Sequence, residues 1–545
     1  MAEESNTEVF VYTVGAVVPQ DVVRVRVHPS VTAIPEFAFK GRKKLEEVEL
    51  CEGLLEIGKQ AFFQCDLLTK ITTIPSTVTV IHESAFAECF SLQEVKFCEG
   101  LREIKRRAFD CCICLKRIWL PNSIERIEED AFVGCKATNF KIPPLMSTIV
   151  EGTFSHSESM CSIELPESIT RIEDMVFMCC RVLRNMAIPP NADIELGTFE
   201  SCTDLQQLFG TEEQIINALK HRFDILPIHK MIYYQSFNNM TVDQLNNALD
   251  VRSGQRRSSR MKLDQTGNKQ DCLGMTPLHI LACSSIQSVD LYKVLITKYP
   301  ENLITKDRWG ALPLLYVVLR NAPTREAPSE IVQFLVESYK TLYPNLQFDW
   351  NEMVLNLARF EALAMRPLAQ QDVIRYVWSI QKETFPDQSF DWDEILEEAV
   401  SRWDKDHSEY IPKRSFIHLV RLSISARANR LGNRKLKHYI HEMLNKTYKI
   451  DCPESSQGRR DYIAGVQEHL VHCENEYRTL KEAITLLELA FWKKRMNDHC
   501  QERNETRRIK RVKIDELQVR QQCRVGSGAD IVIEHVLPYL VTMKE

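Results

Sequence analysis

The sequence of 545 residues predicts an α/β solenoid with a parallel sheet and coils of about 23 residues, followed by a mostly α-helical array. Two observations predict this fold. A phenylalanine recurs every 22 to 24 residues from Phe39 to Phe199, and after Gly210 this rhythm gives way to helical patterns. A unit of this length cannot bury its own apolar side, so consecutive units must stack and share one core.

The composition narrows the classes of function. With 44% hydrophobic residues, 26% charged residues and a net charge of −6, the chain lacks the basic excess of a dedicated nucleic-acid binder. The apolar run from Val9 to Pro19 is shorter than the roughly 20 residues of a membrane helix, and it follows acidic residues where a secretion signal has positive charge. We therefore expect a cytoplasmic or nuclear protein that does not contact membranes, with its 18 cysteines reduced.

Four columns of residues define the repeat. An isoleucine stands five positions before each phenylalanine, a cysteine three positions after it in six copies, and a leucine six positions after it, with Thr138 and Met160 as exceptions. We expect these columns to form the buried spine of the solenoid. The phenylalanines are Phe39, Phe62, Phe86, Phe109, Phe132, Phe154, Phe177 and Phe199.

The segment after each phenylalanine ends in the period-two alternation that is typical of a strand. Leu45 to Leu50 ("LEEVEL") and Leu115 to Leu120 ("LKRIWL") are examples. Stacked coil on coil, these segments are expected to form one parallel sheet. Its exposed face is expected to continue through the last copy, where Gln207 and Phe209 occupy the outward positions.

The outward strand positions are the candidate partner-binding residues. Trp119 is unusual among them because it is a large apolar side chain with Arg117 and Lys141 nearby, which is the composition of a binding hot spot. The alternative is that Trp119 only covers a neighbouring side chain, since single exposed apolar residues are common. The full candidate set is Arg26, Glu47, Glu49, Lys70, Glu94, Lys96, Arg117, Trp119, Lys141 and Glu164.

The period and phrase, as in "SITRIEDMVFMCCRVLRNMAI" (Ser168 to Ile188), resemble the BspA-like leucine-rich repeats over about residues 21–210. The resemblance implies a curved leucine-rich-repeat solenoid whose usual work is to bind other proteins. Many members of that family are surface-exposed, and this sequence departs from them because it has no recognisable export signal.

The remaining chain is divided by composition. Residues 1–20 form an N-terminal arm and residues 211–251 a helical connector. Residues 252–270 form a basic linker, for which a nuclear address or a phosphorylatable switch are alternatives to a simple solvated loop. An ankyrin-like and helix-pair array is expected over 271–440, and a long helix with a C-terminal helical tail over 441–545.

The phrase "DCLGMTPLHILAC" (Asp271 to Cys283) resembles an ankyrin repeat, and a degenerate copy starts 36 residues later at Asp307. In such units the Thr276 and His279 side chains tie the turn to its helix, so we interpret His279 as structural. Because two copies are too few for an independent ankyrin stack, they are expected to pack on neighbouring helices.

Two further phrases, "YPNLQFDW" and "FPDQSFDW", stand 42 residues apart. Asp349 and Asp391 are expected to cap the helices that follow. The aromatic residues of both phrases are expected to pack between those helices. They are Phe348, Trp350, Phe390 and Trp392. The order of all these phrases is similar to that of multidomain diatom proteins of unassigned role.

An apolar seam of heptad type runs from Val466 to Leu487. It either packs within the chain or pairs with a second chain. A basic segment follows from Lys493 to Lys513.

The sequence contains no phosphate-binding glycine loop, nucleophile elbow or His-Glu-x-x-His helix. The Cys111 and Cys114 pair and the group of His469, His472 and Cys473 are too incomplete to predict a metal site. We expect no catalytic residue, cofactor or metal, and predict a non-catalytic scaffold or adaptor that binds other proteins. The alternatives are a nucleic-acid-associated regulator that uses the basic segments and a thiol-based redox or enzymatic regulator.

Overall fold

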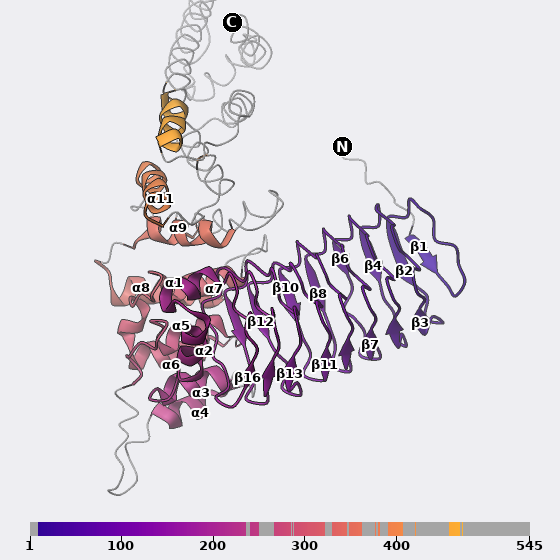
Figure 1. Ribbon diagram of the computed structural model, residues 1–545, viewed down its shortest axis with the longest axis horizontal. Coiled ribbons are helices and arrows are strands. Elements are labelled where there is room, and N and C mark those ends of the chain that lie inside the picture. The colour runs from indigo at the N-terminus through magenta and orange to yellow at the C-terminus, as the bar shows by residue number, and fades with distance from the viewer. Residues whose placement is uncertain are drawn as a thin grey trace, which may run out of the picture. The chain divides into compact units, whose positions relative to one another are not determined.

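The computed structural model divides the chain into two compact units, Met1–Leu419 and Val420–Glu545. The first unit contains a β-solenoid and a helical region (Figure 1). In the second unit, a helix is described over 457–468. The structure describes residues 9–235, 240–249, 266–284, 286, 288–321, 330–345, 348–361, 377, 380–381, 391–406, 420, 457–468 and 471.

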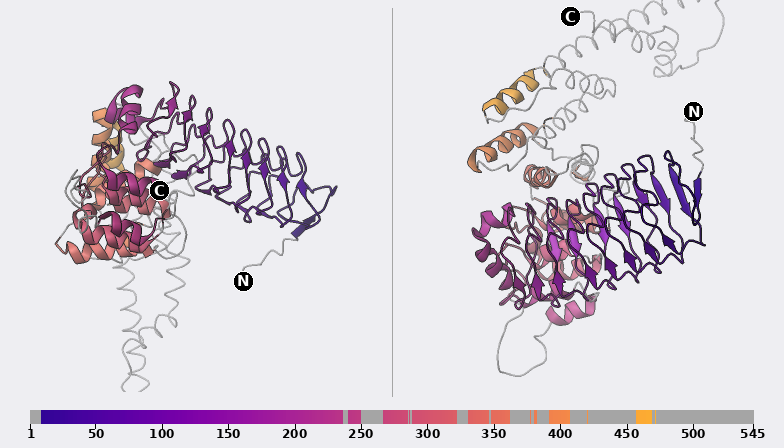
Figure 2. Two further views of the ribbon diagram at one scale, coloured as in Figure 1. Left: turned by 90° about the horizontal axis from the view of Figure 1, so that it is seen from below. Right: turned by 45° about the vertical axis from the view of Figure 1, so that its right-hand side comes forward.

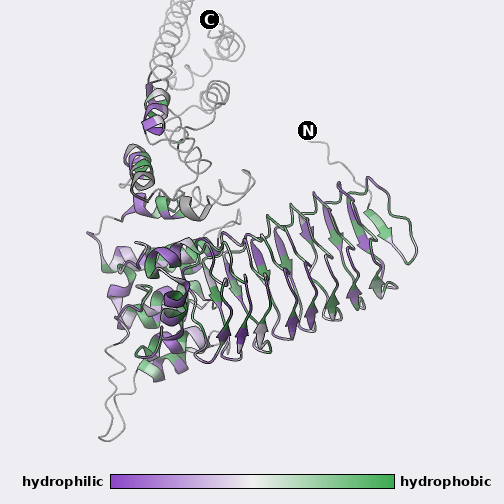
Figure 3. Cartoon of the chain, in the orientation of Figure 1, coloured by the Kyte–Doolittle hydropathy of each residue, from purple (hydrophilic) through white to green (hydrophobic). Residues whose placement is uncertain are grey.

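The strands that follow the phenylalanines stack in parallel along one side of the solenoid (Figure 2). They confirm the strands that the period-two alternation predicts. The first sheet has the order β1(Val9–Tyr12), β2(Arg24–Val27), β4(Glu47–Glu49), β6(Lys70–Ile71), β8(Glu94–Lys96), β10(Arg117–Trp119). A two-stranded sheet of β12(Asn139–Lys141) and β14(Ser162–Glu164) follows it. Hydrophobic and hydrophilic residues alternate along these strands (Figure 3).

The isoleucine column forms a second set of parallel strands, so the expectation of one sheet was wrong. One sheet contains β3(Ala33–Ile34), β5(Glu56–Ile57), β7(Val80–Ile81), β9(Glu103–Ile104) and β11(Arg126–Ile127). The other contains β13(Thr148–Ile149), β15(Arg171–Ile172) and β16(Asp193–Ile194). The isoleucines are therefore both core residues and ladder residues.

The strand ladder on the first side is interrupted between β10 and β12 because one coil is a residue short. Arg117 stands eight positions after Phe109, whereas Asn139 stands only seven positions after Phe132. Ala137 is fully buried there, five positions after its phenylalanine, which explains why Thr138 breaks the leucine column.

The eight phenylalanines are fully buried, as predicted, and their rings stack on one another. Ring centroids of successive coils lie between 4.9 Å (Phe39 and Phe62) and 6.2 Å (Phe154 and Phe177) apart. The backbone joins the same positions, since the Phe62 amide donates to the Ala85 carbonyl at 2.8 Å and the pattern recurs along the solenoid.

The cysteine column has a hydrogen-bonding role. The Cys65 thiol donates to the Phe39 carbonyl of the preceding coil at 3.1 Å, and Cys112 does the same to Phe86. Where serine replaces cysteine, the Ser157 hydroxyl donates to the Phe132 carbonyl at 3.4 Å. A small side chain with a donor satisfies a buried carbonyl without leaving a void.

Helices follow the eighth phenylalanine. The expected last strand, with Gln207 and Phe209 facing outward, is instead the helix α1(Thr203–Phe209). It is followed by α2(Glu212–Lys220), α3(Pro227–Gln235), α4(Val242–Leu249), α5(Pro277–Cys283), α6(Val289–Lys298), η3(Pro300–Leu303), α7(Pro313–Asn321), α8(Glu330–Leu342), α9(Trp350–Glu361) and α11(Trp392–Asp406).

Helices α5 and α7 follow two similar turns that stand 36 residues apart. The Asp271 carboxylate accepts from the Met275 amide at 2.8 Å, and Asp307 accepts from Ala311 at 2.9 Å. His279 is fully buried, its Nδ1 lies 2.9 Å from the Thr276 hydroxyl, and its Nε2 donates to the Ala311 carbonyl. These contacts confirm a structural role for His279.

The predicted caps at Asp349 and Asp391 are also confirmed. Each carboxylate accepts a 3.0 Å hydrogen bond from the amide three residues later, at the starts of α9 and α11. Phe348, Trp350 and Trp392 are buried. Phe390, most of the seam after Val466, residues 252–265 of the basic linker and the basic segment from Lys493 to Lys513 lie outside the described residues.

Candidate protein-binding surface

The exposed face of the first sheet, from β2 to β10, contains most of the predicted partner-binding residues. Strand register places one column of outward residues side by side, with charges that alternate in sign along the solenoid. This column, which we call the charge ladder, consists of Arg24, Glu47, Lys70, Glu94 and Arg117. The alternation lets each charge meet an opposite one on the neighbouring strand.

Three ion pairs form along the charge ladder. The Glu47 carboxylate lies 3.8 Å from Arg24 Nε and 2.6 Å from Lys70 Nζ, and Arg117 Nη1 lies 3.3 Å from Glu94. Exposed pairs of this kind each contribute at most about 1 kcal/mol. They help to fix the register of the strands, and they leave little uncompensated charge for a partner.

The second outward column carries the exposed aromatic residue. Arg26 and Glu49 are joined by a hydrogen bond, which lowers the pKa of Glu49. Further along this column, Lys96 Nζ lies 5.6 Å from the centroid of the Trp119 ring and 2.8 Å from Glu94. Trp119 keeps 49% of its surface exposed despite this cation–π contact. The structure therefore places Trp119, Lys96 and Arg117 together at the end of the six-stranded sheet.

The exposed face stops after β10 because the helical region covers the next strands. The Asn139 amide on β12 donates to the Cys283 carbonyl of α5 at 3.0 Å, and the Tyr233 hydroxyl of α3 donates to the Ile163 carbonyl of β14. Glu164 is only 3% exposed, so its predicted position on the solvated face was wrong. Lys141 is half-buried, which lowers its pKa.

Buried charges hold the helical region against the last coils, and sequence patterns did not reveal them. Arg222 pairs with Asp271 at 2.7 Å and donates to the Asn185 side chain and the Met186 carbonyl. Arg184 pairs with Asp204 at 2.6 Å, and both side chains are fully buried. These residues lie 20 to 49 positions apart in sequence, with no repeat that relates them.

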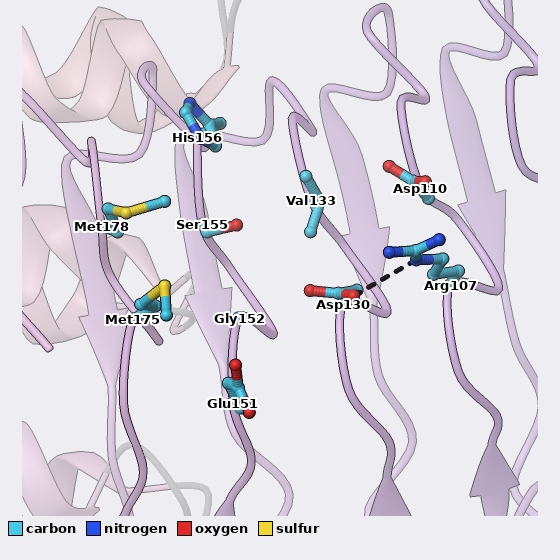
Figure 4. A pocket seen from close by; sticks show the side chains of 10 residues that line it. All are labelled: Arg107, Asp110, Asp130, Val133, Glu151, Gly152, Ser155, His156, Met175 and Met178. Carbon is cyan, nitrogen blue, oxygen red and sulfur yellow. Dashed lines mark hydrogen bonds and ion pairs between the residues drawn. The ribbon is translucent and has the colours of Figure 1, made fainter. Parts of the chain in front are cut away.

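A second feature that the sequence did not reveal is a hollow of ≈ 160 Å³ on the side formed by the phenylalanine turns (Figure 4). Its walls come from the positions two before and one after the phenylalanine in four consecutive coils, together with Glu151 and His156. We call it the turn-face pocket. The repeat could have indicated it, because these two positions carry small side chains in the middle of the pocket, at Val133, Gly152 and Ser155.

The thiol next to this pocket is not activated. Burial and the adjacent Asp110 carboxylate raise the pKa of Cys111 to about 12. Burial also raises the pKa of Asp110. Because the thiolate is the reactive form, Cys111 lacks the environment of a redox-active cysteine.

In the part of the chain that the structure describes, no group of three or more His, Cys, Asp and Glu side chains is arranged to hold a metal ion. Within the same residues, no helix combines the length and apolar character needed to cross a membrane.

Comparison with known families identifies a BspA type leucine rich repeat region, matched over residues 21–138 and 125–248. The chain therefore contains such a region, as the repeat predicted. The expected ankyrin-like arrangement and the likeness to diatom proteins stay predictions. No curated protein matches the chain.

Several solved structures are similar to part of the chain. A leucine rich repeat protein of T. pallidum is 22% identical over 36% of this chain and 81% of its own, with a TM-score of 0.26. The pneumococcal vaccine antigen PcpA is 18% identical over 31% of this chain and 51% of its own, with a TM-score of 0.24. A leucine rich cell surface protein from Faecalibacterium prausnitzii is 21% identical over 33% of this chain and 77% of its own, with a TM-score of 0.17.

Proposed function

We propose that this protein is a non-catalytic scaffold that binds another protein through the exposed sheet face of β2 to β10, with Trp119 as the anchor. The observation that carries the proposal is the half-exposed Trp119 ring beside Lys96 and Arg117, on a face whose other charges largely neutralise one another. Aromatic residues and arginine dominate binding energy at protein interfaces.

Two further points support the proposal. Leucine-rich-repeat proteins are generally protein-interaction scaffolds, and repeat stacks present broad surfaces without deep pockets. The helical region covers β12 and β14 and leaves the preceding strands exposed. The binding face in this proposal is therefore smaller than the set of residues that the sequence predicted, because Glu164 is excluded.

The first prediction is that Trp119→Ala removes an anchor without weakening the fold. Proteins that bind this face should lose roughly 30-fold in affinity, the effect of losing about 2 kcal/mol at a hot spot. The melting temperature should stay the same, because the ring is half exposed. Quantitative pull-down from native lysate with the full chain identifies the partners, and titration of each purified partner gives its affinity.

The matched control is Leu145→Ala, which removes another exposed apolar side chain outside the sheet face. A partner that depends on the sheet face is retained by this control and lost by Trp119→Ala. Retention of every partner by Trp119→Ala, at wild-type affinity, contradicts the proposal.

A further inference from the structure

The turn-face pocket exists because of a local change in the repeat. In the coils of Phe132 and Phe154, the outward turn positions hold the short side chains of Asp130, Val133, Gly152 and Ser155. The flanking coils hold Arg107, Asp110, Met175 and Met178, of which all but Asp110 are long. Short side chains between long ones leave the hollow that Figure 4 shows. The backbone around it is the same hydrogen-bonded stack as elsewhere in the solenoid.

The volume of the pocket limits what it can hold. Sites for drug-sized ligands and cofactors usually measure about 300–1,000 Å³, while a cavity of about 150 Å³ accepts one benzene-sized group. At ≈ 160 Å³ the turn-face pocket fits one side chain and excludes a cofactor.

The lining combines an apolar wall with an acidic rim. Met175 and Met178 project from one side, and thioether side chains adapt to the shape of an aliphatic chain. The lining contains three carboxylates, those of Asp110, Asp130 and Glu151, and one arginine, so its charged residues have a formal net charge of −2.

The single arginine does not fill the pocket. Arg107 Nε donates a 3.2 Å hydrogen bond to Oδ2 of Asp130, which belongs to the next coil. Half of the Arg107 side chain is exposed. The Asp130 carboxylate lies over Gly152. A Cβ added to Gly152 would lie only 2.3 Å from Asp130 Oδ1. Arg106 Nη2 also lies 4.0 Å from Asp130 Oδ2, so both arginines pair with that oxygen. Gly152 makes room for the other oxygen, Oδ1, in the wall of the pocket, where a further cation can approach it.

We propose that the turn-face pocket binds one arginine or lysine side chain from a basic, extended segment of a partner protein. The aliphatic stem lies against Met175 and Met178, and the cationic group meets the carboxylates of Asp110, Asp130 and Glu151. Long cationic side chains bury their stems on apolar surface in this way while their charge stays among polar groups. The pocket lies on a different side of the solenoid from Trp119, so this inference is independent of the function proposed above.

Fluorescence anisotropy with the full chain tests the inference. The probe is a fluorescein-labelled peptide of alternating arginine and glycine, and the matched probe has citrulline, the uncharged analogue, in place of arginine. The arginine peptide should bind and the citrulline peptide should not. Asp110→Asn and Glu151→Gln should each weaken binding about ten-fold, as expected for the loss of a charge-assisted contact.

Two controls separate the pocket from the general acidity of the chain. Glu200→Gln removes an exposed charge from the same side of the solenoid and should leave binding unchanged. Val133→Phe fills the hollow without a charge change and should abolish binding; Phe63 already occupies the equivalent position in its own coil, so the fold can accept it. Trp119→Ala should have no effect.

The proposal is overturned if Glu200→Gln weakens binding of the arginine peptide as much as Asp110→Asn and Glu151→Gln do. It is also overturned if Val133→Phe keeps its melting temperature and binds the peptide as the wild type does. Binding of the citrulline peptide with the affinity of the arginine peptide also overturns it.

Discussion

At the scale of single residues, the turns depend on backbone conformations that most amino acids disfavour. The residues two before and two after each phenylalanine have positive φ angles, from 51° at Gln60 to 94° at Gly197. Only Gly41, Gly134, Gly152 and Gly197 are glycine at these positions. Left-handed backbone costs other residues roughly 1–2 kcal/mol each, which the stacking of buried phenylalanines must offset.

Gly134→Ala tests this cost. Gly134 has a φ of 68°, and an added Cβ would meet only Cys111 Cα, at 3.9 Å, so the change isolates backbone strain from steric overlap. We expect it to reduce the free energy of unfolding by ~1–2 kcal/mol, measured by chemical denaturation. Cys179→Ala at the same position of its coil is the control, because that residue already bears the strain, and it should change stability by less than ~0.5 kcal/mol. Equal effects of the two changes would contradict the interpretation.

The repeat therefore indicates which side chains are buried. It does not indicate the left-handed backbone conformation that the turns require. Phenylalanine, isoleucine and cysteine columns are visible because burial restricts residue type. The left-handed positions are occupied by Gln, Arg, Asp, Cys and other residues, so no composition signal marks them. The donor role of the cysteine thiol was equally hidden, although Ser157 in the same column is a signal for it.

At the scale of elements, the charge ladder stabilises the pairing of neighbouring strands. Lys70 lies between Glu47 and Glu94 in the strand register. Lys70→Glu would place three carboxylates in a row, and like charges on adjacent strands destabilise a sheet. We expect a loss of about 1 kcal/mol, visible as a lower melting temperature at low ionic strength and largely recovered at 0.5 M NaCl because salt screens exposed charges.

Lys44→Glu makes the same charge change at an exposed lysine outside the strands and serves as the control. A melting temperature that falls equally for both changes, or one that salt does not recover, would show that the ladder does not stabilise the sheet. The alternating signs of the ladder can be read from the sequence once the 23-residue register is known. The break at β10 and β12 can also be read from it, because one residue is missing between Phe132 and Asn139.

At the scale of the whole first unit, the helical region and the solenoid share buried ion pairs, and these contacts could not be predicted. The alternation along a strand indicates which residues face the solenoid core. It does not indicate that Glu164, on the opposite face, is buried under the helical region. Arg222 and Asp271 come from opposite ends of the segment that contains the basic linker, and only the fold brings them together.

A double-mutant cycle on Arg222 and Asp271 tests whether this contact joins the two regions. Both side chains are fully buried at the ion pair, so removal of one partner leaves an uncompensated charge in the interior. We expect Asp271→Asn and Arg222→Met each to cost ~3–5 kcal/mol and the double variant to cost less than the sum. In calorimetry of the full chain, the solenoid and the helical region should melt in one shared transition in the wild type. They should melt in separate transitions in the single variants. Asp290→Asn, which breaks the exposed pair with Lys293, should change neither quantity. Additive costs with one shared transition would mean that other contacts hold the helices to the solenoid.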